Sequence, residues 1–104
     1  MIRHIVMWKL KEEAEGASLK KNAEKLKLIL EGLRINIEEI KDVEVGIQIT
    51  EDGGKESCDV VLICDFMTEL DFKMYTRSPH HKKATDFIKT VADKRYFVDY
   101  KVDL

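Results

Sequence analysis

The chain has 104 residues, of which 44% are hydrophobic and 37% charged, and 18 basic against 20 acidic side chains leave a formal net charge of −2. Lysine runs alternate with glutamate runs, so the sequence lacks the single-sign surface typical of proteins that bind nucleic acid or anionic membranes. Its length supports one hydrophobic core, and we expect one domain over residues 1–104.

The apolar runs and the cysteines predict a cytoplasmic protein. No apolar run approaches the roughly 20 residues that cross a bilayer. The opening MIRHIVMWKL has no small-residue cleavage site, so it predicts a strand and not a signal peptide. Cys58 and Cys64 fall in one strand-like run, about 20 Å apart at ~3.3 Å per residue and beyond disulfide reach. Two reduced thiols fit the same compartment.

The first half of the chain predicts a strand, a helix and a second strand. Residues 2–10 alternate two largely apolar sets. After the breaker EGAS, Ser18 can cap a helix, and residues 43–50 then alternate apolar and polar as a strand with one buried face. Residues 50–57, TEDGGKES, are a turn by composition. The helix carries apolar side chains at three- and four-residue steps: Leu19, Ala23, Leu26, Leu30 and Leu33.

The second half predicts a strand, two helical segments and a last strand. Residues 59–67 are apolar on both faces. Thr68 with Asp71 resembles a capping box and opens a short helical segment. Ser78 and Pro79 begin a longer helix, because serine suits the N-cap and proline the first helical position. Its apolar stripe comprises Ala84, Phe87, Ile88, Val91 and Ala92. Residues 95–104 alternate as the last strand.

This β-α-β-β-α-β order predicts a ferredoxin-like α+β fold, with two helices on one face of a four-stranded antiparallel sheet. Ile5, Met7 and the doubly apolar third strand imply that the other face is buried as well. Because the chain has no third layer, we expect a homodimer that packs sheet to sheet into an α+β barrel and buries at least about 1,600 Å². The alternative is a monomer with an apolar sheet face.

Three segments together resemble the stress-responsive A/B barrel (Dabb) family: IRHIVMWKLKEEA, YTRSPHH and FVDYKVDL. The matching positions are His4 on the first strand, Tyr75 with Pro79 and His81 before the second long helix, and Asp99 with Tyr100 at the end. The resemblance covers nearly the whole chain and implies a dimeric α+β barrel. Most members have no defined reaction, but a minority resemble polyketide cyclases, in which a tyrosine and a histidine at these positions act on an aromatic-forming substrate.

His81, Tyr75 and His4 are the candidate catalytic residues. A Ser78 cap places His80 and His81 in the first turn, where the positive helix end favours a neutral imidazole that can accept a proton. His81 is then a candidate general base, Tyr75 an oxyanion donor, and His4 an orienting group. The resemblance selects His81, although periodicity places His80 nearer the centre of the apolar stripe. The alternatives are solvent-facing histidines, a packed Tyr75 and a hydrogen-bonded core His4.

The sequence also offers candidate ligand-binding residues, with His80 as the polar one. The alternative for the apolar members is an ordinary core. Tandem histidines lack metal-ligand spacing, and Gly53-Gly54 lacks the lysine of a phosphate loop, so we expect no metal and no cofactor. The apolar candidates are Trp8, Val60, Leu62, Phe66, Phe72 and Met74.

Three functions follow from these patterns. The first is a pocket between sheet and helices that binds a small apolar or aromatic molecule. The second is an enzyme of cyclase, lyase or isomerase type that uses His81, Tyr75 and His4. The third is a non-catalytic dimeric scaffold with a fully packed interior.

Overall fold

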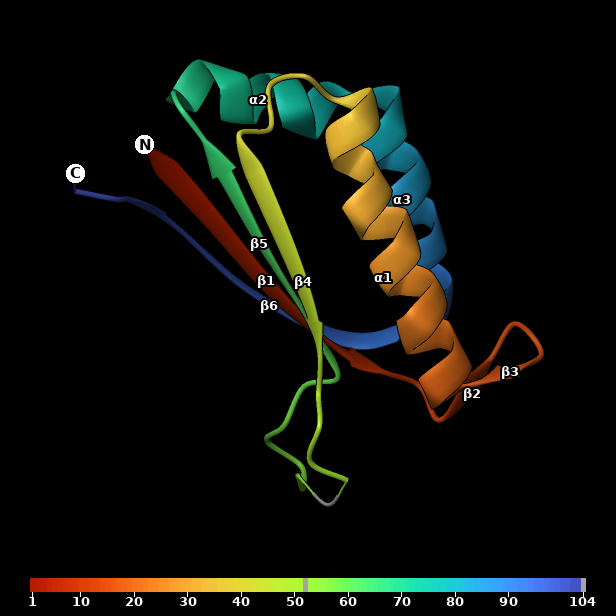
Figure 1. Cartoon of the computed structure of the whole chain (residues 1–104). Coiled ribbons are helices and arrows are strands. Elements are labelled where there is room, and N and C mark those ends of the chain that lie inside the picture. Colours follow the sequence, from red (N-terminus) through yellow and green to blue (C-terminus); the bar gives the residue numbers. More distant parts are fainter. Residues whose placement is uncertain (52, 104) are drawn as a thin grey trace.

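Four antiparallel strands form the sheet on which the molecule is built (Figure 1). In this computed structural model, which describes residues 1–51 and 53–103, the strand order is β4-β5-β1-β6. The bounds are β1 Ile2–Leu10, β4 Asp42–Ile47, β5 Val60–Phe66 and β6 Ala92–Lys101. The first strand therefore lies inside the sheet and pairs with the last strand along its whole length.

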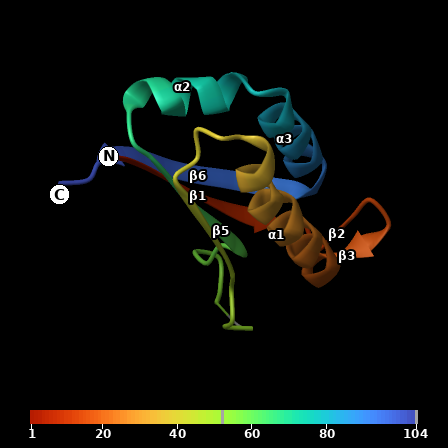
Figure 2. The same cartoon turned by 45° about the horizontal axis from the view of Figure 1, so that its top comes forward.

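Three helices lie on one side of this sheet, as Figures 1 and 2 show. The helices α1 (Leu19–Asn36) and α3 (Pro79–Val91) run side by side, and α2 (Glu69–Arg77) crosses one end. A short hairpin of β2 (Glu13–Ala14) and β3 (Ala17–Ser18) precedes α1. Among the described helices, none is long and apolar enough to cross a membrane. The predicted ferredoxin-like α+β fold is confirmed.

The helices begin at the residues that the sequence predicts. Pro79 is the first residue of α3 and follows its N-cap. A capping side chain of this kind stabilises a helix by about 1 kcal/mol. The cap hydroxyls accept backbone N–H groups, Ser18 from Lys21 at 3.3 Å, Thr68 from Asp71 at 3.1 Å and Ser78 from His80 at 3.2 Å. The last of these bonds fixes the two histidines in the first turn of α3.

The hydrophobic core lies between the helices and the inner face of the sheet. Side chains alternate along a strand, and every second residue of β1 and β5 is buried against the helices. The helix face predicted for α1 is buried with them, apart from half-buried Leu19. The largest fully buried side chains are Tyr75, Phe66, Leu26, Leu30, Leu62, Val6, Val60 and Val91.

No described helix covers the outer face of the sheet (Figure 2), and this face carries apolar side chains. Ile5 pairs with Ile63 on one side and with Val98 on the other, so all three lie on this outer face. Val98 is 51% exposed. The full set is Ile5, Met7, Val61, Ile63, Tyr96, Val98 and Tyr100, and we call it the open face. The apolar pattern of the strands predicts that a second copy of the chain covers this face.

Strand ends and one hairpin differ from the sequence prediction. The second predicted strand ends at Ile47, and Ile49 is 93% exposed. Gln48 still donates its backbone N–H to the carbonyl of Asp59 at 2.8 Å, but the next amide on that side, of Thr50, donates to the Gln48 side chain and not to a neighbouring strand. The EGAS segment forms a hairpin turn, because Glu15 and Gly16 both have positive φ.

The last strand also differs, since it begins at Ala92 and ends at Lys101 instead of spanning 95–104. Asp52, in the predicted turn at 50–57, and Leu104, at the predicted end of the strand, lie outside the described residues.

Candidate functional site

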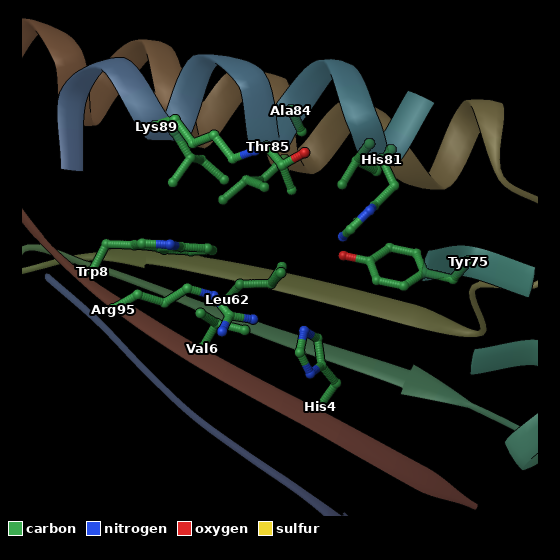
Figure 3. A pocket seen from close by; sticks show the side chains of 13 residues that line it. His4, Val6, Trp8, Leu62, Tyr75, His81, Ala84, Thr85, Lys89 and Arg95 are labelled. Carbon is green, nitrogen blue, oxygen red and sulfur yellow. The ribbon is translucent and has the colours of Figure 1, made fainter. Parts of the chain in front are cut away.

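A cavity of about 200 Å³ lies between the sheet and the helices α1 and α3 (Figure 3). An apolar cavity of roughly 150 Å³ can hold a benzene molecule, so this one has space for a single ring with a short substituent. Most of its wall is apolar and comes from Val6, Leu30, Leu33, Leu62, Ala84 and Ile88.

The three candidate catalytic residues meet at one end of this cavity, although they come from three different elements. His4 lies on β1, Tyr75 near the end of α2 and His81 in the first turn of α3. The ring centroids of Tyr75 and His81 are 4.6 Å apart, and those of His4 and Tyr75 are 6.1 Å apart. In Figure 3 the Tyr75 hydroxyl and the His81 ring point into the same part of the cavity, with His4 on the sheet side.

Helix geometry explains why His81 and not His80 lines the cavity. Residues three, four, seven and eight positions apart share a helix face, and His81 shares one with Ala84, Thr85, Ile88 and Lys89, which all line the cavity. His80 lies on the opposite flank of the buried stripe and is exposed. The periodicity of the sequence predicted the apolar stripe of α3. It did not predict on which side of that stripe the cavity lies.

The environment of the pocket favours the neutral form of both His81 and Tyr75. Burial lowers the pKa of His81, and the nearby His4 and Arg95 lower it further, while a backbone hydrogen bond to Thr76 acts the other way. Burial is also the main cause that raises the pKa of the Tyr75 hydroxyl. At neutral pH, therefore, His81 is a proton acceptor and Tyr75 is a hydrogen-bond donor.

A carboxylate on the last strand holds the His4 ring. Asp99 on β6 is the direct cross-strand partner of His4, and its Oδ1 bonds the ring Nδ1. This bond fixes the orientation of the ring, so that Nε2 is the ring nitrogen left free for other contacts. The sequence gave Asp99 only as part of a family motif, and the antiparallel pairing of first and last strands is the signal that would have found its role.

The cavity also has polar groups that the sequence analysis did not select. Lys89 on α3 and Arg95 on β6 line it. The Arg95 side chain runs from its backbone beside Trp8 toward His4 (Figure 3), and its guanidinium lies 4.5 Å from the centre of the Phe97 ring. Trp8, a predicted ligand-binding residue, lines the cavity and pairs with Arg95 across the strands. Arg95 is the first residue of the predicted last strand. Knowledge of how that strand pairs with β1 would have placed Arg95 beside Trp8 and so identified it as a site residue.

Of the predicted ligand-binding residues, Trp8 and Leu62 line the cavity and the others do not. Phe66 and Phe72 pack behind the site, with Phe66 5.0 Å from Tyr75 and Phe72 5.1 Å from His4 between ring centroids. They support the rings of the site but are not part of the cavity wall. The remaining three are buried Val60, 48% exposed Met74 and exposed His80.

Within the described residues there is no group of three or more histidine, cysteine, aspartate or glutamate side chains that could hold a metal ion. The polar groups of the lining residues are imidazole, phenol, hydroxyl, indole, ammonium and guanidinium groups. Acid/base chemistry and hydrogen bonding are the functions that this set can perform.

The fold and the site define a ferredoxin-like α+β protein with a small pocket between sheet and helices. The family model of the stress responsive A/B barrel domain matches residues 2–102. The chain belongs to this family, as the resemblance of its three segments implied. A search of curated proteins gave no significant match.

Solved structures with the same fold cover nearly all of this chain. A dimeric protein of unknown function with a ferredoxin-like fold from Bacteroides fragilis is 25% identical, with a TM-score of 0.79 over 97% of this chain and 95% of that one. A dimeric ferredoxin-like protein of unknown function from Thermobifida fusca is 22% identical, with a TM-score of 0.80 over 97% of this chain and 90% of that one. The hydroxynitrile lyase from Passiflora edulis is 18% identical, with a TM-score of 0.78 over 98% of this chain and 93% of that one. These last two structures show similarity of fold alone.

Proposed function

We propose that the protein binds a small apolar or aromatic molecule of about one ring in the cavity between sheet and helices. The observation that carries this proposal is a cavity of about 200 Å³ with apolar walls and polar groups at its ends. Binding sites for small molecules combine an apolar lining with a few directed polar groups in this way. A cavity of this size argues against a scaffold whose interior is filled by its own side chains.

Filling the cavity tests the proposal. Ala84 is buried in its wall, so Ala84→Leu places three more carbon atoms in the space that a ligand would occupy. The fluorescence of Trp8, the single tryptophan, reports binding of phenol and benzyl alcohol. We expect both compounds to bind the unmodified protein. Their affinity for the Ala84→Leu variant should be at least tenfold lower.

The matched control is Ala17→Leu, on the hairpin and away from the cavity. It should bind like the unmodified protein. If neither ligand alters Trp8 fluorescence or thermal stability in the unmodified protein, or if Ala84→Leu binds as well as the control, the pocket does not bind such molecules.

A second candidate function, acid/base catalysis of cyclase, lyase or isomerase type, is favoured by the neutral His81 beside Tyr75. Many such reactions remove a proton from a carbon next to a carbonyl group. His81 would accept that proton, the electron pair of the C–H bond would move to form the enolate, and Tyr75 would donate a hydrogen bond to its oxygen. Return of the proton to carbon would complete an exchange.

Hydrogen–deuterium exchange into phenylacetone in D₂O, followed by NMR, measures this step without knowledge of the natural substrate. We expect exchange above the buffer rate, and a fall of about a hundredfold in His81→Ala, the usual scale for a general base. His80→Ala is the matched control, because it removes the neighbouring imidazole outside the cavity. Equal rates in the two variants, or no exchange at all, would reject catalysis of this type.

We also propose that the protein is a homodimer joined through the open face. Related structures are dimeric ferredoxin-like proteins, and the open face is apolar at its centre with the Arg3–Asp65 ion pair, 2.8 Å, at its margin. An apolar centre with a polar margin is the usual composition of an interface.

The free thiols Cys58 and Cys64 support the expected cytoplasmic location.

A further inference from the structure

We propose that Trp8, Lys89 and Arg95 form a carboxylate subsite in the cavity, so that the ligand class is a small aromatic or apolar acid. This inference rests on the proposed ligand binding and adds the charge of the ligand and its orientation.

The indole of Trp8 supplies the first observation. Trp8 is only 3% exposed and lines the cavity. Its Nε1–H is buried and has no hydrogen-bond partner among the described residues. A buried donor without an acceptor is costly, and an indole N–H can only donate. The nitrogen itself is closed to solvent in this structure, so a ligand oxygen would satisfy it once a small shift of the neighbouring side chains lets the oxygen approach.

The charges that line the cavity supply the second observation. Arg95 is the direct cross-strand partner of Trp8, and Lys89 approaches from α3 on the other side of the cavity (Figure 3). Both line the cavity, and within the described part of the chain neither forms an ion pair with a carboxylate. Arg95 also helps to lower the pKa of His81, so its charge acts across the pocket.

The remaining lining residues fit an anion and give no site for a cation. Among residues 1–51 and 53–103, no aspartate or glutamate lines the cavity. The carboxylate that lies next to the site belongs to Asp99, and it is bonded to His4. A carboxylate between Trp8 and the Arg95 guanidinium would accept hydrogen bonds from the indole and the guanidinium. Its ring would then lie against Val6, Leu62 and Ile88.

Benzoate and benzyl alcohol test the subsite, because they share the ring and differ in the charged group. Trp8 fluorescence measures both affinities at the same site. We expect benzoate to bind the unmodified protein at least tenfold more tightly than benzyl alcohol at low salt. Added sodium chloride should weaken benzoate binding and leave benzyl alcohol unaffected, because salt screens the charge interaction alone.

Variants of the subsite locate the preference. Arg95→Gln should reduce the benzoate affinity to within threefold of that of benzyl alcohol, and Lys89→Gln should have a smaller effect in the same direction. The matched control is Arg34→Gln on α1, which removes the same charge outside the cavity and whose exposed pair with Asp42, at 3.7 Å, contributes little. Trp8→Phe, followed by ligand-induced shifts in melting temperature, should lessen the benzoate shift and keep the benzyl alcohol shift.

The outcomes separate this inference from the function on which it rests. If benzyl alcohol binds and benzoate binds no better, or if Arg95→Gln and Arg34→Gln behave alike, the pocket function stands and the carboxylate subsite is rejected. If neither compound binds, the proposed function itself fails, and the subsite fails with it.

Discussion

The two faces of the sheet differ in a way that a hydrophobic core alone does not explain, because the covered face includes ionisable side chains and the uncovered face carries exposed apolar ones. The face covered by helices holds His4, with Tyr75 and His81 above it. The uncovered face presents Ile5, Val98 and their apolar neighbours. Alternate residues of one strand, β1, supply both.

The difference indicates that the two faces serve different purposes. Polar groups in a covered layer are costly unless bonded or used, and apolar groups on an uncovered layer mark a contact with another molecule. This contrast is the basis of both proposals, a functional site in the layer between sheet and helices and assembly through the open face. Each face can be altered without touching the other, because side chains on the two faces point in opposite directions.

The largest effect is expected from a charge on the open face. Val98→Glu places a carboxylate at the centre of the proposed interface, where its burial without a partner is unfavourable. We expect the dimer dissociation constant to rise more than about a hundredfold, as measured by sedimentation, on the scale of an interface hot spot. Leu28→Glu is the matched control, because Leu28 on α1 is 72% exposed. A Val98→Glu protein that remains dimeric would place the interface elsewhere.

A smaller effect is expected from the cap that positions His81 over the covered face. Ser78→Ala removes the acceptor of the His80 amide, and we expect the free energy of unfolding to fall by about 1 kcal/mol, measured by urea denaturation. Ser78→Asn keeps a capping oxygen and should retain the stability. Equal losses in both variants would show that the hydroxyl does not act as a cap.

A still smaller effect is the pH dependence that His81 gives to stability. Its pKa in the folded protein lies below the ordinary value of 6.5, so the unfolded chain binds more protons between these two pH values. The contribution of neutral His81 is complete above pH 6.5 and is lost as the pH falls from 6.5 to the lowered pKa. Chemical denaturation across this window should show a flatter dependence in His81→Asn, with His80→Asn as control. The same slope in both variants would contradict the burial of His81.

The smallest change is spectroscopic. His4 is one of the groups that lower the pKa of His81, because two imidazolium rings across a small pocket repel each other. His4→Gln should therefore raise the pKa of His81 toward 6.5 in an NMR titration, and His80→Gln should leave it in place. An unmoved His81 in His4→Gln would mean that the two rings are not coupled.

Signals between neighbouring residues in the sequence predicted the fold. The composition of the candidate site depends instead on which strands pair and in which register. Ser18, Thr68 and Ser78 mark helix starts that depend only on neighbouring residues. The open face also followed from alternation within single strands. These features need no knowledge of which segments meet in space.

The candidate site was only partly predictable for the same reason. Three residues selected on resemblance meet at the cavity, but Arg95 enters it through the register of β6 against β1, which includes an irregularity at Lys9 and Leu10. Phe66 and Phe72 could not be told from cavity wall, because a core and a pocket have the same apolar periodicity in sequence.

The His4–Asp99 bond joins residues 95 positions apart, and this separation has a consequence for synthesis. Contacts between distant segments form late, since they require closure of the longest loops. During translation His4 leaves the ribosome first and has no partner until the C-terminal strand follows. A chain that stops before β6 lacks Asp99, Arg95 and the open-face residues Tyr96, Val98 and Tyr100. Prematurely terminated copies therefore lack the Asp99 partner of His4 and the Arg95 part of the cavity wall, so the site is completed only when the last strand has been synthesised.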